Sequence, residues 1–250
     1  PLLVSALRGL SPLCISLVLL FSLSSITLAA KRCQVSIKAK CAAKISLLDS
    51  YRYYLIGMFY NNLLPTSIGG DVFRICLLNK GINQPYQVSS AVFIERLAGF
   101  FAVLFLSLSG ALLLYAMEGP AVYVYYLSGL LFVTGLITIL LFNPTFWFFI
   151  RNIFQDLALP EWVLAVGKFI NILHEYRLQK KLLGKILILS ILYQMCDILV
   201  AYMFGIVIGF NISFPFFLLF IPLVYIATLI PVSINGLGVR ENAIVYLFST

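Results

Sequence analysis

Long apolar runs constrain this chain more than any other feature. The run Val88–Met117 holds one acidic and one basic residue, and the run Ala121–Phe142 holds no charged residue. The hydrocarbon core of a bilayer is about 30 Å thick, and a helix needs about 20 apolar residues to cross it. With 62% hydrophobic and 10% charged residues, the chain lies far outside the composition of soluble domains. The sequence therefore predicts an all-α, polytopic integral membrane protein built as a helical bundle.

Further segments complete the expected bundle. Residues 10–30 lack a cleavage-site pattern and lead directly into basic residues, which predicts a spanning helix instead of a signal peptide. Ile186–Phe210 predicts another crossing, and Phe214–Ile230 is apolar but interrupted by prolines. Glu161–Gln179 has apolar residues at helical spacing, which predicts an amphipathic helix on the cytosolic face with its aromatic residues in the interface.

The distribution of basic residues predicts the topology. Of the seventeen Lys and Arg residues, twelve fall in Lys31–Arg52 and Arg151–Lys185. Short connections rich in Lys and Arg stay in the cytoplasm, so both segments are predicted to be cytoplasmic loops of a multi-pass plasma membrane protein. Because the net charge of +8 is explained in this way, no nucleic-acid partner is expected. Residues 1–250 are expected to be a single transmembrane domain from a longer protein, since the chain starts without Met and stops within an apolar run.

Cofactor chemistry is not indicated. The five cysteines form no CxxC pair, and His174 is the only histidine, so no Cys/His metal site is expected. The sequence has no Walker sequence, no DxD pair and no GxGxxG. No nucleotide or other cofactor is therefore expected.

Two stretches interrupt the apolar pattern and resemble each other. NNLLPTSIGGDVFR runs from Asn61 to Arg74, and LIPVSINGLGVR runs from Leu229 to Arg240. Aligned without gaps, Leu, Pro, Ser, Ile, Gly and Arg coincide, and internal symmetry of this kind is typical of many transporter folds. If both stretches are re-entrant pairs of half-helices, an odd number of crossings separates them and the repeat is inverted. If Phe214–Ile230 crosses the bilayer fully, both stretches lie on the cytosolic side.

The first stretch carries its own chemical signal. Pro65, Gly69 and Gly70 break the helix, and backbone groups freed in hydrocarbon must be satisfied by protein or by a hydrated cavity. The N-terminus of the following helix favours an anion such as phosphate, and glycines let a headgroup approach the backbone. Asp71 and Arg74 lie three residues apart, so they share a face and can pair with each other or divide a zwitterionic headgroup.

Other ionisable residues are predicted at membrane depth. Glu95 and Arg96 lie about 10 Å into their helix, and Asp197 lies inside another crossing. Each is costly unless paired or hydrated, which predicts an inward-facing polar cavity. The alternative is that Glu95 or Arg96 bonds Arg74 or Asp71 to hold helices together, and for Asp197 helix pairing is an equal alternative.

The ordered trio NNLLPTSIGGDVFR, ERLAGF and IPVSINGLGVRE resembles the transmembrane, flippase-like domain of lysylphosphatidylglycerol synthases and of the many membrane proteins that share only that domain. The resemblance implies lipid transfer between leaflets, with two signatures at Asn61 or Asn62, Pro65, Gly69, Gly70, Asp71 and Arg74, and at Pro231, Asn235, Gly236, Gly238, Arg240 and Glu241. Together with Glu95 and Arg96, these residues are predicted to bind lipid headgroups.

Three functions are weighed on this basis. The first is a lipid transporter for anionic or zwitterionic phospholipid, or for a polyprenyl-linked phosphate, in which Arg74, Arg96 and Arg240 neutralise phosphate. The second is a membrane-embedded transferase or accessory subunit, with Asp71 or Glu95 as base. The third is a passive anchor for a soluble lipid-modifying enzyme. No soluble aminoacyl-transferring domain is present in these residues, so synthase activity is not inferred, and the transporter is favoured over an enzyme.

Overall fold

A computed structural model of the chain describes residues 12–41, 45–64, 69–117, 119–143, 145, 161–209, 212–228 and 236–249, with backbone alone for residues 161–168 and 249. These residues form helices, and no strand occurs among them. The all-α prediction is thereby confirmed.

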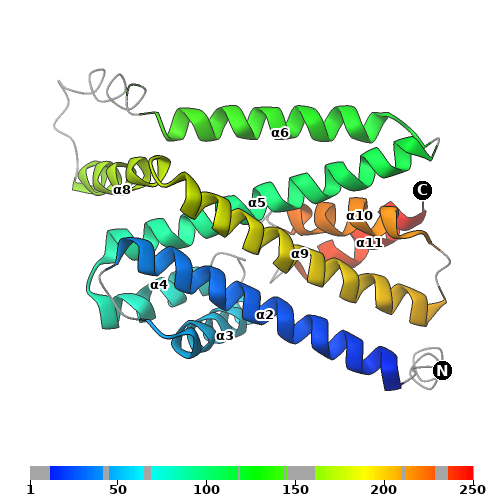
Figure 1. The fold of residues 1–250 in the computed structure, drawn as a ribbon, viewed down its shortest axis with the longest axis horizontal. Coiled ribbons are helices and arrows are strands. Elements are labelled where there is room, and N and C mark those ends of the chain that lie inside the picture. The colour runs from blue at the N-terminus through cyan, green and yellow to red at the C-terminus, as the bar shows by residue number, and fades with distance from the viewer. Residues whose placement is uncertain are drawn as a thin grey trace.

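Four helices in the described part of the chain are long and apolar enough to cross a membrane: α2 (Pro12–Lys40), α5 (Pro85–Ala116), α6 (Val122–Leu141) and α9 (Lys180–Ile208). They run along the long axis of the molecule (Figure 1). Helix α2 packs along α9, and α5 packs against both. Helix α6 packs on α5 and buries Leu127 alone among its residues. A helix that is apolar on all sides and exposed in this way is suited to contact with lipid.

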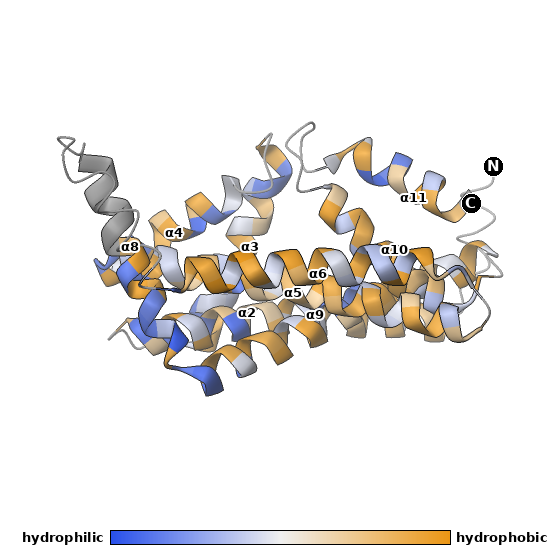
Figure 2. Ribbon diagram, turned by 90° about the horizontal axis from the view of Figure 1, so that it is seen from above, coloured by the Kyte–Doolittle hydropathy of each residue, from blue (hydrophilic) through white to orange (hydrophobic). Residues whose placement is uncertain are grey.

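Two pairs of shorter helices form hairpins. The first pair is α3 (Leu47–Leu63) and α4 (Gly69–Ile82), and the second is α10 (Phe214–Ala227) and α11 (Val239–Ser249). The first hairpin lies over the half of the bundle that contains α8, and the second lies over the other half (Figures 1 and 2). Each hairpin begins and ends toward its own end of the long axis.

The described part of α10 bears on the two topologies that the sequence left open. Its 14 residues rise by about 21 Å, at about 1.5 Å per residue, which is shorter than the hydrocarbon core. Helix α11 then returns toward the end from which α10 started (Figure 1). Two hairpins at opposite ends of the long axis agree with the expected inverted repeat of broken helices, while their re-entrance into the membrane stays a prediction.

Glycines let the hairpins pack closely. A Cβ on Gly70 would lie 2.0 Å from the carbonyl oxygen of Gly57, so α3 and α4 approach each other through backbone. On α5, a Cβ on Gly110 would lie 2.6 Å from the backbone nitrogen of Leu219 in α10. Ser107 donates a hydrogen bond to the Leu219 carbonyl oxygen at 3.2 Å beside this contact. Both hairpins are thus held by contacts that a side chain would block.

The first basic segment differs from the prediction. Helix α2 continues to Lys40, about three turns beyond the end expected at residue 30, so much of Lys31–Arg52 is helix instead of loop. Arg32 is buried and donates a hydrogen bond to Ser190 of α9 at 3.0 Å. The extension of α2 thus packs along α9, where Arg32 finds a hydrogen-bond partner inside the bundle.

The amphipathic helix is confirmed, but Tyr176 is buried in the bundle instead of lying at an interface. Helix α8 spans Glu161–Arg177. Phe169 contacts Phe93 of α5 edge to face, with ring centroids 5.6 Å apart, and Tyr176 is fully buried. The side chain of Trp162 lies outside the described residues. The apolar face of α8 therefore covers the end of the bundle, because α5 and α9 present apolar side chains there.

The two basic segments lie at the same end of the molecule. The C-terminal end of α2, helix α8 and the start of α9 meet there (Figure 1). Lys40 pairs with Glu175 of α8 at 2.8 Å. This common end agrees with a shared side of the membrane, while the cytoplasmic assignment of that side stays a prediction.

We predict that Gly70→Ala destabilises the protein by about 1–3 kcal/mol, because an added methyl group overlaps the Gly57 carbonyl and forces α3 and α4 apart. Thermal unfolding in detergent measures the effect. Gly81→Ala on the same helix is the matched control, since a Cβ there meets nothing within 4 Å. Equal melting temperatures for the two variants would contradict the packing role of Gly70.

Candidate functional site

Charged side chains from α4 and α5 meet inside the bundle. Arg74 pairs with Glu95 at 3.1 Å, and with Asp71 at 3.7 Å. Asp71 also accepts a hydrogen bond from Arg96 Nε. Ser36 of α2 donates to the second Glu95 oxygen at 2.5 Å. We call Asp71, Arg74, Glu95 and Arg96 the charged network; it connects the first hairpin to two spanning helices.

The charged network has a buried part and a more open part. The side chains of Arg74 and Glu95 are 4% and 1% exposed, whereas Arg96 is 45% exposed and Asp71 is 13% exposed. Two cations face two carboxylates, so the formal charges balance, which a low-dielectric interior requires. The pairing of Glu95 and Arg96 with Arg74 and Asp71, which the sequence left as the alternative to an inward-facing polar cavity, is what the structure shows. This pairing holds helices together, and it leaves one arginine accessible.

The start of α4 is capped by its own hairpin. The Gly70 N–H donates a hydrogen bond to Asn61 Oδ1 of α3 at 2.8 Å, so one of the free N–H groups expected to face an anion already has a partner. A Cβ on Gly69 would lie 2.4 Å from Leu64 Cδ1. In this structure the two glycines serve the contact between α3 and α4. A headgroup-binding role for Asn61, Gly69 and Gly70 stays a prediction.

The second stretch uses its glycines differently. Gly236 and Gly238 have φ angles of +74° and +81°, a backbone region that residues with a Cβ rarely adopt. The Gly238 N–H donates to Glu241 at 2.6 Å, which is a capping contact at the start of α11. Arg240 is exposed. Among the described residues, no ion pair joins Arg240 to the charged network. Arg74 and Arg240, both expected to neutralise phosphate, are therefore not in direct contact.

Some predicted site residues cannot be placed. Pro65, Pro231 and Asn235 lie outside the described residues. Asn62 is exposed near the end of α3. Their proposed roles stay predictions from the sequence.

A second group of polar side chains lies between α2 and α9, and sequence reasoning anticipated only Asp197 among its members. Arg32 donates to Ser190 at 3.0 Å, and its guanidinium lies over the ring of Tyr193 at 5.4 Å. Asp197 interacts with the hydroxyl of Tyr193. Arg32 was counted among the topological charges of a loop. The signal that could have indicated burial is the spacing of polar residues: Arg32 and Ser36 are four residues apart, so they lie on the same face of a helix.

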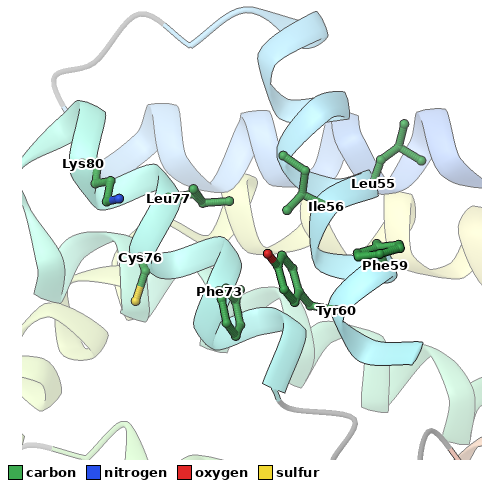
Figure 3. Close-up of a pocket in the computed structure, with 8 residues that line it drawn as sticks. All are labelled: Leu55, Ile56, Phe59, Tyr60, Phe73, Cys76, Leu77 and Lys80. Atoms are coloured by element: carbon green, nitrogen blue, oxygen red, sulfur yellow. The ribbon is translucent and has the colours of Figure 1, made fainter. Parts of the chain in front are cut away.

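An apolar groove of about 720 Å³ lies between α3 and α4 (Figure 3). The rings of Tyr60 and Phe73 stack in it with centroids 4.0 Å apart, and Lys80 lies at one end. The groove is lined by Leu55, Ile56, Phe59, Tyr60, Phe73, Cys76, Leu77 and Lys80. Asp71 and Arg74, three residues apart, belong to another face of α4 and contact α5. Helix α4 therefore separates an apolar groove from the charged network.

We predict that Glu95→Gln lowers the free energy of unfolding by about 3–5 kcal/mol, because it leaves the buried Arg74 without its closest counter-charge. Asp49→Asn is the control: the side chains of Asp49 and Arg52 are 45% and 67% exposed in their pair, and an exposed pair contributes little to stability. Denaturant or thermal unfolding in detergent compares the two variants. A loss no larger in Glu95→Gln than in Asp49→Asn would contradict a stabilising buried pair.

Comparison with known proteins adds the family. A family model described as the lysylphosphatidylglycerol synthase TM region matches residues 2–250. No curated protein and no solved structure matches the chain. The family match covers nearly the whole chain and agrees with the long apolar helices of the bundle. The chain is a multi-pass membrane protein and belongs to the lysylphosphatidylglycerol synthase TM region family.

Proposed function

We propose that this protein binds the phosphate of a phospholipid, or of a polyprenyl-linked lipid, and moves the lipid between leaflets. The observation that carries the proposal is the charged network, in which two arginines and two carboxylates meet inside a membrane bundle. Ionisable groups within a membrane are costly, and they commonly mark substrate pathways. Membership of the family agrees with the proposal and leaves the activity itself to experiment.

Asp71 is the group that a headgroup would displace. It contacts both Arg74 and Arg96, and it is more exposed than Glu95. A phosphate diester offers the same negative oxygens and can replace Asp71 at the two guanidinium groups, which bind phosphate well. Glu95 would remain on Arg74 and limit the loss of stability. The displaced Asp71 could then receive the cationic part of a zwitterionic headgroup.

The surroundings of the charged network suit an amphipathic substrate. The apolar groove between α3 and α4 (Figure 3) could hold an acyl or prenyl chain while the headgroup enters the bundle. The two hairpins enter from opposite ends, and paired broken helices at mid-membrane are a recurrent architecture of transporters. In this proposal the first hairpin receives the headgroup, and the second hairpin, which carries Arg240, releases it.

We predict that Arg96→Gln slows leaflet exchange of a fluorescent phospholipid in proteoliposomes at least tenfold, because a charge-assisted contact to phosphate contributes about 1.5–3 kcal/mol. Arg52→Gln is the control, since Arg52 is an exposed arginine near the start of α3. Arg240→Gln tests the second hairpin in the same assay. Equal rates for wild type, Arg96→Gln and Arg240→Gln, with folding intact, would contradict the proposed path. Exchange no faster than in empty liposomes would contradict transport itself.

A further inference from the structure

Arg32 is a buried cation that the charged network does not include. Its residue is 7% exposed, and it lies on the membrane-spanning helix α2. Among the described residues, the guanidinium donates one hydrogen bond, from Nη1 to the neutral hydroxyl of Ser190 at 3.0 Å, and it lies over the ring of Tyr193. Its Nε atom is buried and has no hydrogen-bond partner. The guanidinium group of Arg32 therefore uses only part of its hydrogen-bonding capacity.

The contrast with Arg74 shows what is missing at Arg32. Arg74 has two carboxylates within 4 Å, whereas no ion pair within the described residues includes Arg32. Asp197 lies within electrostatic range of Arg32, but it interacts with the hydroxyls of Ser25 and Tyr193. A buried cation without a direct counter-charge is unfavourable. An anion that contacts the guanidinium would remove this cost.

The position of Arg32 places it between the two hairpins. Ser36, one turn along α2, donates a hydrogen bond to Glu95 of the charged network. In the other direction, Asp197 lies within electrostatic range of Tyr225 of α10, and Tyr225 lies within range of Arg240. Arg32 thus lies one helical turn from a contact of the charged network, and Asp197 couples it electrostatically toward α10.

We infer that Arg32, Ser190 and Tyr193 form a second binding site for the phosphate diester of a lipid, between the charged network and the second hairpin. The inference deepens the proposed function and rests on it for the lipid class. The guanidinium supplies the positive charge and the Nε–H group, which has no partner in the described part of the chain. Ser190 supplies a hydroxyl that now donates to the Ile186 carbonyl oxygen and can turn to donate to phosphate. The planar fork of arginine matches two phosphate oxygens, which a lysine ammonium does not.

The test measures binding, so it does not depend on transport. The purified full chain in detergent is titrated with dioctanoyl phosphatidylglycerol and with dioctanoylglycerol, which has the same chains and no phosphate. Arg32→Gln should weaken binding of the phosphate-bearing lipid about tenfold, as expected for loss of one charge-assisted contact, with binding of the neutral lipid unchanged. Lys31→Gln is the matched control, because Lys31 is exposed on the preceding position of the same helix and its loss should leave binding unchanged.

Lipid that binds at the charged network would hide weaker binding at Arg32. Arg32→Gln and Lys31→Gln are therefore also titrated in an Arg96→Gln background. Binding to Arg32→Gln that equals wild type in both backgrounds would overturn the second site. If Arg32→Gln does not fold, Arg32→Lys and Ser190→Ala are titrated in its place. Lipid affinity that is unchanged in both variants would overturn the second site. Displacement of the lipid by millimolar inorganic phosphate would overturn the assignment to a lipid. Arg32-dependent binding without any leaflet exchange would refute the proposed transport and leave the site standing.

Discussion

The buried ion pair between Arg74 and Glu95 is the interaction on which the central arrangement depends. It joins the short helix α4 to the spanning helix α5, and Ser36 extends it to α2. Neither charge could remain in a membrane interior alone, because the cost of desolvation is recovered only through close opposite charge and hydrogen bonds. The position of the first hairpin within the bundle therefore follows from electrostatics as much as from apolar packing. Asp71 and Arg96 then form the more accessible edge of the same network.

The two hairpins reach similar shapes by different means. In the first, Gly70 lets α4 lie against the backbone of α3, and Asn61 caps the start of α4. In the second, Gly236 and Gly238 supply positive φ angles, and Glu241 caps α11. Broken helices within a membrane leave backbone groups that must be satisfied by protein, and each hairpin solves this with its own polar side chain. The repeated sequence thus encodes a repeated shape without repeating each contact.

Individual residues show which contacts could be predicted from the sequence and which could not. Asp71 and Arg74 were expected to share a face of one helix, and their contact follows from local geometry that any helix provides. Their pairing with Glu95 and Arg96 was one of two alternatives, because helical spacing does not say which residues of another helix lie opposite. Arg32 was misassigned, since a basic residue after an apolar run looks the same whether the helix ends or continues into a polar interior. Tyr176 of α8 was misplaced for a related reason: an amphipathic pattern does not distinguish a lipid surface from a protein surface.

The sequence by itself determined that this is an all-α membrane protein, where its long helices run, and that two related stretches break the pattern. Hydrophobic length and local backbone chemistry are properties of neighbouring residues, so the order of the chain is sufficient to read them. Tertiary structure alone decided that each hairpin begins and ends at its own end of the bundle, that Asn61 caps Gly70, and that Arg32 faces Ser190 across 158 positions of sequence. Those outcomes depend on which helices pack together in the interior, where each buried polar group must find a partner that the local sequence does not contain.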